Sequence, residues 1–338
     1  MTIDTDYFSV KCRRLSLFGA FAVVGLHSTT TMWVTDIVDW VAKLQAFVAS
    51  HLRFAVPLFL VFSGYWFVKS YRRYGYLDFL KRKFWSLYVP FVLCCVIGEI
   101  VVWMSSFWSH TEPSFRSLLY VPFLVTKGLN LAFHLWYVRA LLLIFIAAPF
   151  CYCVARSIIL LLGLLVFTRF WPVVEVGPYS FQYVATVIPY FFIGAMLSDG
   201  NKLAIRTSRK LGIVAVAMSA IGLAILDLCP EWEVRHVLNS QETRTLLCVL
   251  LVWFGYDVLP KSQTCGDWLK YSFFVYIIHV LAIRFSGNVL RYLNDPMSPN
   301  VRLAGYIINW LTFFLDVGLG VLCAKHVPRL YRLLSGGR

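Results

Sequence analysis

The chain has 338 residues, of which 59% are hydrophobic and only 14% charged, and its mean hydropathy is +0.71. Water-soluble domains carry about a quarter charged residues, so this composition excludes an ordinary soluble enzyme. The 20 glycines and 13 prolines are too few for a collagen-like or disordered chain. We therefore predict an all-α fold, a polytopic transmembrane helical bundle that forms one integral-membrane domain over residues 1–338.

The nine cysteines lie mostly within apolar runs. No CxxC pair occurs, and Cys151 and Cys153 lack both the spacing and the histidine companions of a metal site. We interpret them as small buried hydrophobic residues and predict no metal ligands. The first apolar run, Leu15 to Trp33, is too long for the core of a cleavable signal peptide, so we expect it to remain as the first span.

Apolar segments long enough to cross about 30 Å of hydrocarbon recur along the whole chain. We predict ten spans, at residues 15–33, 53–69, 84–104, 135–154, 157–173, 181–198, 211–228, 243–259, 271–289 and 303–323. Segment 115–126 is apolar but short, and we place it in a loop or at the membrane interface. No internal repeat and no linker to a second domain is evident, so any chemistry is expected in the bundle or at its mouth.

Basic residues are distributed unequally between the predicted loops. With a cytoplasmic N-terminus, 20 lysines and arginines fall on the inner side and six on the outer side. Cytoplasmic loops of membrane proteins are enriched in these residues, so we predict that both termini are cytoplasmic. This asymmetry accounts for the net charge of +14 without a nucleic-acid partner; the expected surroundings are the lipid bilayer.

Ionisable side chains within membrane spans are costly and are therefore candidates for function. Five arginines fall in the outer parts of their predicted spans: Arg53, Arg139, Arg169, Arg244 and Arg284. Glu99 is predicted at a similar depth. Each arginine alone could extend toward the outer headgroups. Their shared side favours an outward-facing polar cavity that binds an anion or a hydroxyl-rich ligand.

Two histidines are predicted deeper in the membrane. His27 lies 12 residues after Leu15, or about 18 Å along a helix, and shares a helical face with Arg13, Ser16 and the small residues Gly19 and Ala20. Its imidazole could form a structural hydrogen bond, or act as a general base that Glu99 orients. His279 shares a face with Tyr276, and there a structural hydrogen bond is the favoured interpretation.

Several motifs follow one another in an order that resembles the acyltransferase-3 family, the bacterial polytopic O-acyltransferases of surface polysaccharides. The resemblance extends over about residues 9–325. It rests on the segments LSLFGAFAVVGLH at 15–27, RFAVPLFLVFSG at 53–64 and HLWYV at 134–138, and on the stretch from Tyr276 to His279. It implies an enzyme of the bacterial cytoplasmic membrane that transfers an acyl group, usually acetyl, from a thioester such as acetyl-CoA to a hydroxyl of a glycan or its lipid-linked precursor.

The resemblance also assigns roles to individual residues. It implies that His27 takes part in the acyl transfer, with no permanently bound cofactor besides the acetyl-CoA co-substrate; Glu99, at a similar depth, is predicted to assist it. The family typically has Arg or Lys eleven residues before the histidine, where this chain has Ser16; Arg13, on the same face, is expected to supply the missing cation, which makes Arg13 and Ser16 the predicted donor site. The acceptor is expected to contact Arg53, Ser63, His134, Trp136, Arg139, Tyr276, His279 and Arg284.

Two other classes of protein remain open at this point. A transporter or glycan exporter would use the same outward arginines as a substrate site without covalent chemistry. Matched halves with broken helices would favour it, but Pro57 and Pro189 do not lie in matched halves. A non-catalytic membrane scaffold is the third class. The oligomeric state is left open.

Overall fold

The computed structural model describes residues 5–29, 39–109, 113–126, 129–131, 133–170, 175–176, 179–180, 182–199, 207–228, 240–259, 266–293 and 298–337. These residues form helices almost throughout, which confirms the predicted all-α class. The one sheet among them is a two-residue antiparallel ladder of β1 (Glu175–Val176) and β2 (Tyr179–Ser180).

The longer helices are α1 (Thr5–His27), α2 (Trp40–Leu52), α3 (Ala55–Lys83), α4 (Val89–Ser109), α6 (Trp136–Ile146), α7 (Ala148–Arg156), α8 (Ile158–Phe170), α9 (Gln182–Met196), α10 (Arg209–Leu228), α12 (Ser240–Val258), α13 (Ser272–Leu293) and α14 (Pro299–His326). Shorter turns are η2 (Phe84–Tyr88), α5 (Phe115–Leu118), η3 (Val121–Phe123), η4 (Phe133–Leu135), η6 (Asp267–Tyr271) and α15 (Pro328–Ser335).

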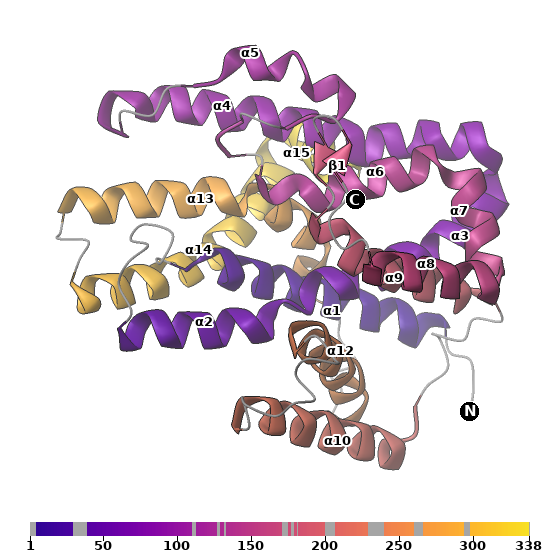
Figure 1. The fold of residues 1–338 in the computed structure, drawn as a ribbon. Helices are drawn as coiled ribbons and strands as arrows, with labels where there is room; N and C mark the ends of the chain where they lie inside the picture. Colours follow the sequence, from indigo (N-terminus) through magenta and orange to yellow (C-terminus); the bar gives the residue numbers. More distant parts are fainter. Residues whose placement is uncertain are drawn as a thin grey trace.

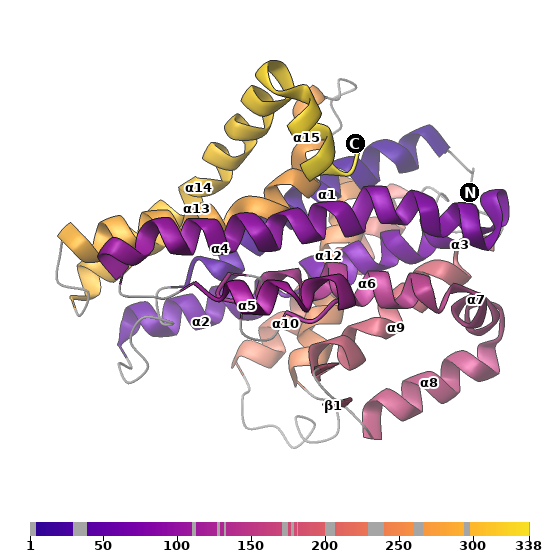
Figure 2. The ribbon, with the colours of Figure 1, turned by 90° about the horizontal axis from the view of Figure 1, so that it is seen from above.

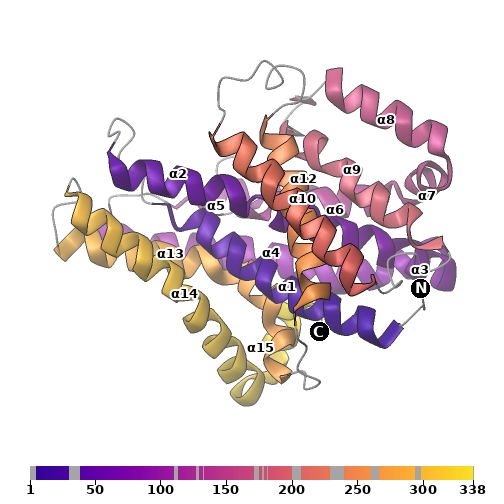
Figure 3. The ribbon, with the colours of Figure 1, turned by 90° about the horizontal axis from the view of Figure 1, so that it is seen from below.

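The helices pack largely as pairs around α1. The main pairs are α3 with α9, α10 with α12, and α13 with α14, and α1 contacts α3, α13 and α14 (Figure 1). From above, α14 and α15 form a bend beside the bundle (Figure 2). From below, α10 and α12 lie across α1 (Figure 3). The first helix therefore contacts elements from both ends of the chain.

Within the described residues, four helical stretches are long and apolar enough to cross a membrane: Trp40–Met104, Arg209–Leu228, Asp267–Gly287 and Pro299–His326. The first of them takes in both α2 and α3 and most of α4. The helices of the bent pair Phe133–Ile146 and Ala148–Arg156 make a fifth if they count as one span. Membrane character is thus supported, whereas the count of ten spans and the cytoplasmic position of both termini stay predictions.

One predicted span is broken. Residues 135–154 do not form a single helix, because the chain bends by 86° between α6 and α7. Pro149 lies in the first turn of α7. Proline lacks the N–H that would continue the helix, and its ring clashes with the preceding turn. The bend at Ala147 follows directly from that residue.

Other boundaries also differ from the predicted ranges. The first helix begins before the predicted span of 15–33 and ends at His27, so this histidine lies in a last helical turn and not in mid-helix; residues 30–38 lie outside the described residues. Helix α2 lies between the predicted spans 15–33 and 53–69, where the sequence predicts an outer loop. Its start at Trp40 is stabilised by Asp39, whose carboxylate accepts a hydrogen bond from the Ala42 amide at 2.9 Å.

Two glycines explain how closely α3 and α9 pack. A Cβ on Gly64 would lie 1.9 Å from the carbonyl oxygen of Phe191, and one on Gly194 would lie 2.0 Å from that of Val61. Only glycine allows backbones to approach this closely. This crossing fixes α3, and with it Phe59 and Ser63, against the rest of the bundle.

Candidate functional site

Three histidines from distant parts of the chain meet in the bundle. The ring centroids of His27 and His279 lie 5.2 Å apart, and those of His134 and His279 lie 5.0 Å apart. The three rings come from the end of α1, from η4 and from α13. All three are residues that the sequence selected, and the fold brings them together.

Hydrogen bonds to α13 hold two of these rings. His134 and His279 are fully buried. Nε2 of His134 lies 3.1 Å from the carbonyl oxygen of Ile277, and Nδ1 of His279 lies 2.8 Å from that of Tyr276. In return, the Tyr276 hydroxyl donates to the His134 carbonyl at 2.6 Å. The stretch from Tyr276 to His279 therefore positions the imidazoles.

These partners also decide where the protons lie. A carbonyl oxygen can only accept, so each ring nitrogen that faces one must carry hydrogen. The other nitrogen of a neutral ring is then an acceptor. Nε2 of His279 and Nδ1 of His134 are buried and have no hydrogen-bond partner among the described residues. The site thus holds two imidazole lone pairs that no described protein group uses.

Of the neighbouring residues His27 and His279, His27 is the less buried. It is only partly buried, and none of the hydrogen bonds among the described residues involves its ring nitrogens. Its one other ring neighbour described is Phe133, with centroids 5.5 Å apart. An imidazole that is only partly buried, forms none of the described hydrogen bonds and lies beside a second imidazole can take up and release a proton.

Aromatic residues and a serine extend the site toward α3. The Ser63 hydroxyl lies 2.9 Å from the Tyr137 hydroxyl. The Tyr137 and Tyr276 rings pack edge to face at 5.6 Å, and Phe59 lies beside both. Ser63, Tyr276 and His134 therefore belong to one continuous cluster with His27 and His279, and their contact with an acceptor stays a prediction. Trp136 begins α6 next to this cluster and is half-buried.

The end of α1 is held by residues that sequence reasoning did not select. The Asn309 side-chain amide donates to the Ser28 carbonyl at 3.2 Å, and Asn309 in turn accepts from the Ser286 hydroxyl at 2.6 Å. Carbonyls at a helix C-terminus need such partners. Trp310 packs directly on Gly25, where a Cβ would lie 2.2 Å from its ring. A buried asparagine within an apolar helix is the signal that could have identified this support.

Comparison with known proteins identifies the family. Residues 17–324 match the model of the acyltransferase-3 family, described as an acyltransferase domain. The chain belongs to the acyltransferase-3 family. No curated protein and no solved structure matches it. The match covers nearly the whole chain and includes every histidine of the cluster.

In this acyltransferase-3 protein, none of the described hydrogen bonds of Glu99 involves His27. Its buried carboxylate accepts hydrogen bonds from the backbone amides of Ser114 at 2.6 Å and Asn130 at 2.7 Å, and from the Asn130 side chain at 3.1 Å. All of the described contacts of this carboxylate are thus with the segment between α4 and α6. Glu99 anchors that segment, and its predicted role in assisting His27 stays a prediction.

The outer arginines do not share one described network. Arg139 donates to the Thr126 hydroxyl at 3.1 Å, Arg53 is exposed at the end of α2, and Arg284 lies half-buried on α13. The side chain of Arg169 lies outside the described residues. The single cavity expected from the sequence therefore stays a prediction.

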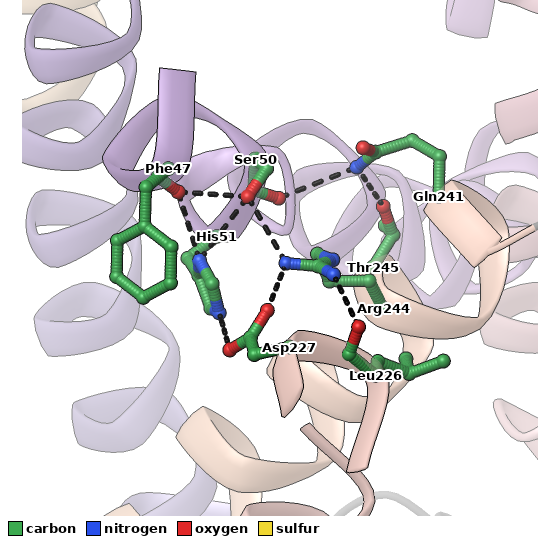
Figure 4. A network of polar contacts seen from close by, with 8 residues as sticks. All are labelled: Phe47, Ser50, His51, Leu226, Asp227, Gln241, Arg244 and Thr245. Carbon is green, nitrogen blue, oxygen red and sulfur yellow. Dashed lines mark hydrogen bonds and ion pairs between the residues drawn. The ribbon is translucent and has the colours of Figure 1, made fainter. Parts of the chain in front are cut away.

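Arg244 of α12 joins this helix to α2 and α10 in a polar network that includes none of the clustered histidines (Figure 4). It pairs with Asp227 at 2.5 Å and donates to the Ser50 hydroxyl at 3.3 Å. His51 reaches the other oxygen of Asp227 at 3.2 Å. This network fastens α2 to the α10–α12 pair, so the described partners of Arg244 are structural.

The predicted donor residues lie on the N-terminal half of α1. Arg13 is exposed and Ser16 half-buried. The small-residue face is not open at Gly19, where a Cβ would lie 2.8 Å from the Phe59 ring. Nearby, the buried Lys11 ammonium pairs with Asp257 at 2.9 Å and lies over the Trp253 ring. Lys11 therefore serves to join α1 to α12.

Metal chemistry has no described ligand set here. Among the described residues, no group of three His, Cys, Asp or Glu side chains is arranged to hold a metal ion. Asp316 on α14 is buried, and its carboxylate has no hydrogen-bond partner within the described part of the chain.

Proposed function

We propose that this protein is a membrane O-acyltransferase that moves an acyl group, acetyl in the simplest case, from a thioester donor to a hydroxyl of a surface glycan or its lipid-linked precursor. The family assignment supports acyl transfer. The observation that carries the proposal is the pair formed by the accessible His27 and the buried His279, 5.2 Å apart between ring centroids. An apolar bundle has no structural need for two adjacent unpaired imidazole nitrogens.

The reaction needs one proton to move and one bond to be exchanged. In direct transfer, His27 takes the proton of the acceptor hydroxyl while that oxygen attacks the thioester carbonyl. The carbon–sulfur bond then breaks, and the imidazolium returns the proton to the leaving thiolate. In the covalent alternative, a His27 nitrogen attacks the thioester carbonyl, the carbon–sulfur bond breaks and the thiol leaves with the imidazole proton; the acceptor hydroxyl then attacks the acyl-imidazole, and its proton returns to His27. In both, the neutral His279 offers its Nε2 lone pair to the neighbouring ring or to the incoming hydroxyl.

The surroundings of the pair suit an acceptor that carries hydroxyl groups. The hydroxyls of Ser63 and Tyr137 lie on the same cluster, and the Phe133 and Phe59 rings border it. Sugar rings combine apolar faces with hydroxyl edges, so aromatic side chains with a few polar groups fit them. We place Trp136, Arg139, Arg284 and Arg53 on the route of this acceptor.

We assign the donor to the cytoplasmic side. With both termini in the cytoplasm of a bacterial inner membrane, Arg13 and Ser16 would face the compartment that holds acetyl-CoA. Arg13 is exposed on α1, where it is free to meet a phosphate group. Phe59 fills the face of Gly19, so the thioester arm has to displace this ring or pass beside it.

The test is ester-linked acetyl on the surface glycans of cells that express the protein. Cells with His27→Ala are compared with cells that carry His326→Ala, which removes an exposed histidine at the end of α14. The proposal predicts loss of the acetyl mass from the glycan for the first variant and none for the second. Full acetylation by a folded, membrane-inserted His27→Ala protein would contradict it.

A further inference from the structure

A cavity lies at the end of the chain, away from the histidine cluster. It measures about 430 Å³ and is lined by Trp85, Arg329, Arg332, Leu333, Gly336 and Gly337. Trp85 belongs to η2, and the other residues belong to α15 and the turn that follows it. None of these residues takes part in the proposed acyl transfer.

The walls of this cavity are fixed by packing. Tyr331 and Leu334 of α15 are buried, and the Tyr331 ring packs 5.6 Å from those of Tyr271 and Phe274. Gly336 has a φ of 68°, and a Cβ there would lie 2.1 Å from the Ser86 carbonyl oxygen. Only glycine permits this approach. The end of the chain is therefore held against η2, and the cavity is a formed feature.

Two cationic side chains without a described acidic partner line this cavity. Arg329 and Arg332 are exposed and lie three residues apart on α15, so they share one side of the helix. None of the ion pairs among the described residues includes either arginine. Guanidinium groups bind phosphate oxygens with paired donors. The cavity thus offers two cations to one anion.

The apolar residues around these arginines indicate what carries the anion. Trp85 is 58% exposed and Leu333 43% exposed, although both line the cavity. Leu330 and Phe84, beside them in the sequence, are 43% and 45% exposed. Helices with basic and large apolar side chains lie in the membrane interface, where tryptophan is also enriched. A lipid acyl chain would cover these apolar side chains, whereas a free nucleotide would leave them exposed to water.

We propose that this cavity binds the phosphate headgroup of an anionic phospholipid. Arg329 and Arg332 hold the phosphodiester, while Trp85 and Leu333 contact the first part of an acyl chain. The bound lipid joins α15 to η2, and through Tyr331 it stabilises the beginning of α13, the helix that carries His279. The inference rests on the cavity alone and holds whatever reaction the bundle performs.

The test measures lipid binding to the purified full-length protein. The thermal unfolding midpoint is recorded in nanodiscs of phosphatidylcholine into which phosphatidylglycerol is titrated. Two variants are compared: Arg329→Gln with Arg332→Gln, and a control of equal charge loss, Arg73→Gln with Lys325→Gln, whose exposed side chains lie outside the cavity. A third arm adds acetyl-CoA to the wild-type protein and to both variants.

We expect phosphatidylglycerol to raise the wild-type midpoint. The cavity variant should need at least about tenfold more of this lipid for the same rise, because the hydrogen bonds from both guanidinium groups to the phosphate are lost. The control should stay within about twofold of wild type. Equal losses in both variants would overturn the proposal, since the effect would then be diffuse surface charge. It would also be overturned if the cavity variant lost only the response to acetyl-CoA, because the cavity would then be a nucleotide site.

Discussion

The His27 and His279 rings lie 5.2 Å apart, although one residue ends the first helix and the other belongs to α13. His279 is fixed by its Nδ1 contact with the Tyr276 carbonyl, at 2.8 Å, whereas His27 forms none of the described hydrogen bonds. One ring is therefore held in place by a hydrogen bond, and no described hydrogen bond holds the other. In the proposed reaction, His279 is the positioned partner and His27 the reacting group.

Replacing His279 by glutamine tests its contribution. Glutamine keeps a hydrogen-bonding side chain but loses the imidazole lone pair, so we expect acyl transfer to fall by about 10²-fold, the lower end of acid–base effects. The readout is the initial rate of transfer from labelled acetyl-CoA, with the unfolding midpoint measured alongside. An unchanged rate in a folded protein would assign His279 a purely structural role.

Asn309 is predicted to act as a positioning residue. Asn309→Ala removes the hydrogen bond to the Ser28 carbonyl and the shorter of the two contacts of the Ser286 hydroxyl, which keeps the Ile283 carbonyl as an acceptor at 3.0 Å. Loss of one partner in a buried pair costs about 1–3 kcal/mol, and the end of α1 that carries His27 should loosen. We expect the maximal rate to fall with little change in the donor KM.

Asn309→Asp is the matched variant: it keeps an acceptor for Ser286 and puts an oxygen in place of the amide donor, and an ionised carboxylate would also face the Ser28 carbonyl at this buried position. A positioning role requires that this variant also lower the maximal rate. If both variants changed stability alone, Asn309 would be a packing residue without influence on His27.

Glu99 is expected to matter for the segment it anchors. In Glu99→Gln, an NH2 group replaces one carboxylate oxygen and faces the backbone N–H of Ser114 or Asn130. Both groups are donors, so no hydrogen bond forms between them. We expect a loss of about 1–3 kcal/mol in stability and faster limited proteolysis between α4 and α6. Proteolysis at the wild-type rate would contradict this assignment.

The Lys11–Asp257 pair allows a stability prediction. Both side chains are 2% exposed, and removal of one partner from a buried ion pair costs about 3–5 kcal/mol because an unpaired charge remains. Lys11→Met and Asp257→Leu should each lower the unfolding midpoint, and the double variant should recover much of the loss. Additive losses in this double-mutant cycle would show that the two charges do not interact.

The sequence predicted which polar side chains lie in the bundle better than it predicted which groups they contact. His27, Tyr276 and His279 were identified because polar side chains stand out within apolar helices, and each now lies in one cluster. The partner of Glu99 was not predictable, since it consists of backbone amides whose positions depend on the path of a loop. Asn309 was overlooked because its role depends on the end of another helix.

Helix boundaries followed hydropathy only in part. Long apolar runs such as residues 211–228 correspond closely to a single helix, Arg209–Leu228. The run 135–154 is equally apolar, and its break depends on Pro149 and on the turn before it. Helix α2 carries exposed Trp40 and Phe47 beside polar residues, a mixture that hydropathy assigns to a loop.

The most direct measurement is acetyl transfer by His27→Gln, which removes the imidazole and keeps a polar side chain of similar length. Ester-linked acetyl is released from surface glycans by mild base and quantified for wild type, His27→Gln and the control His326→Gln, at equal amounts of membrane-inserted protein. The account predicts a loss of about 10²- to 10⁴-fold for His27→Gln and wild-type acetylation for the control. Wild-type acetylation by His27→Gln would contradict it.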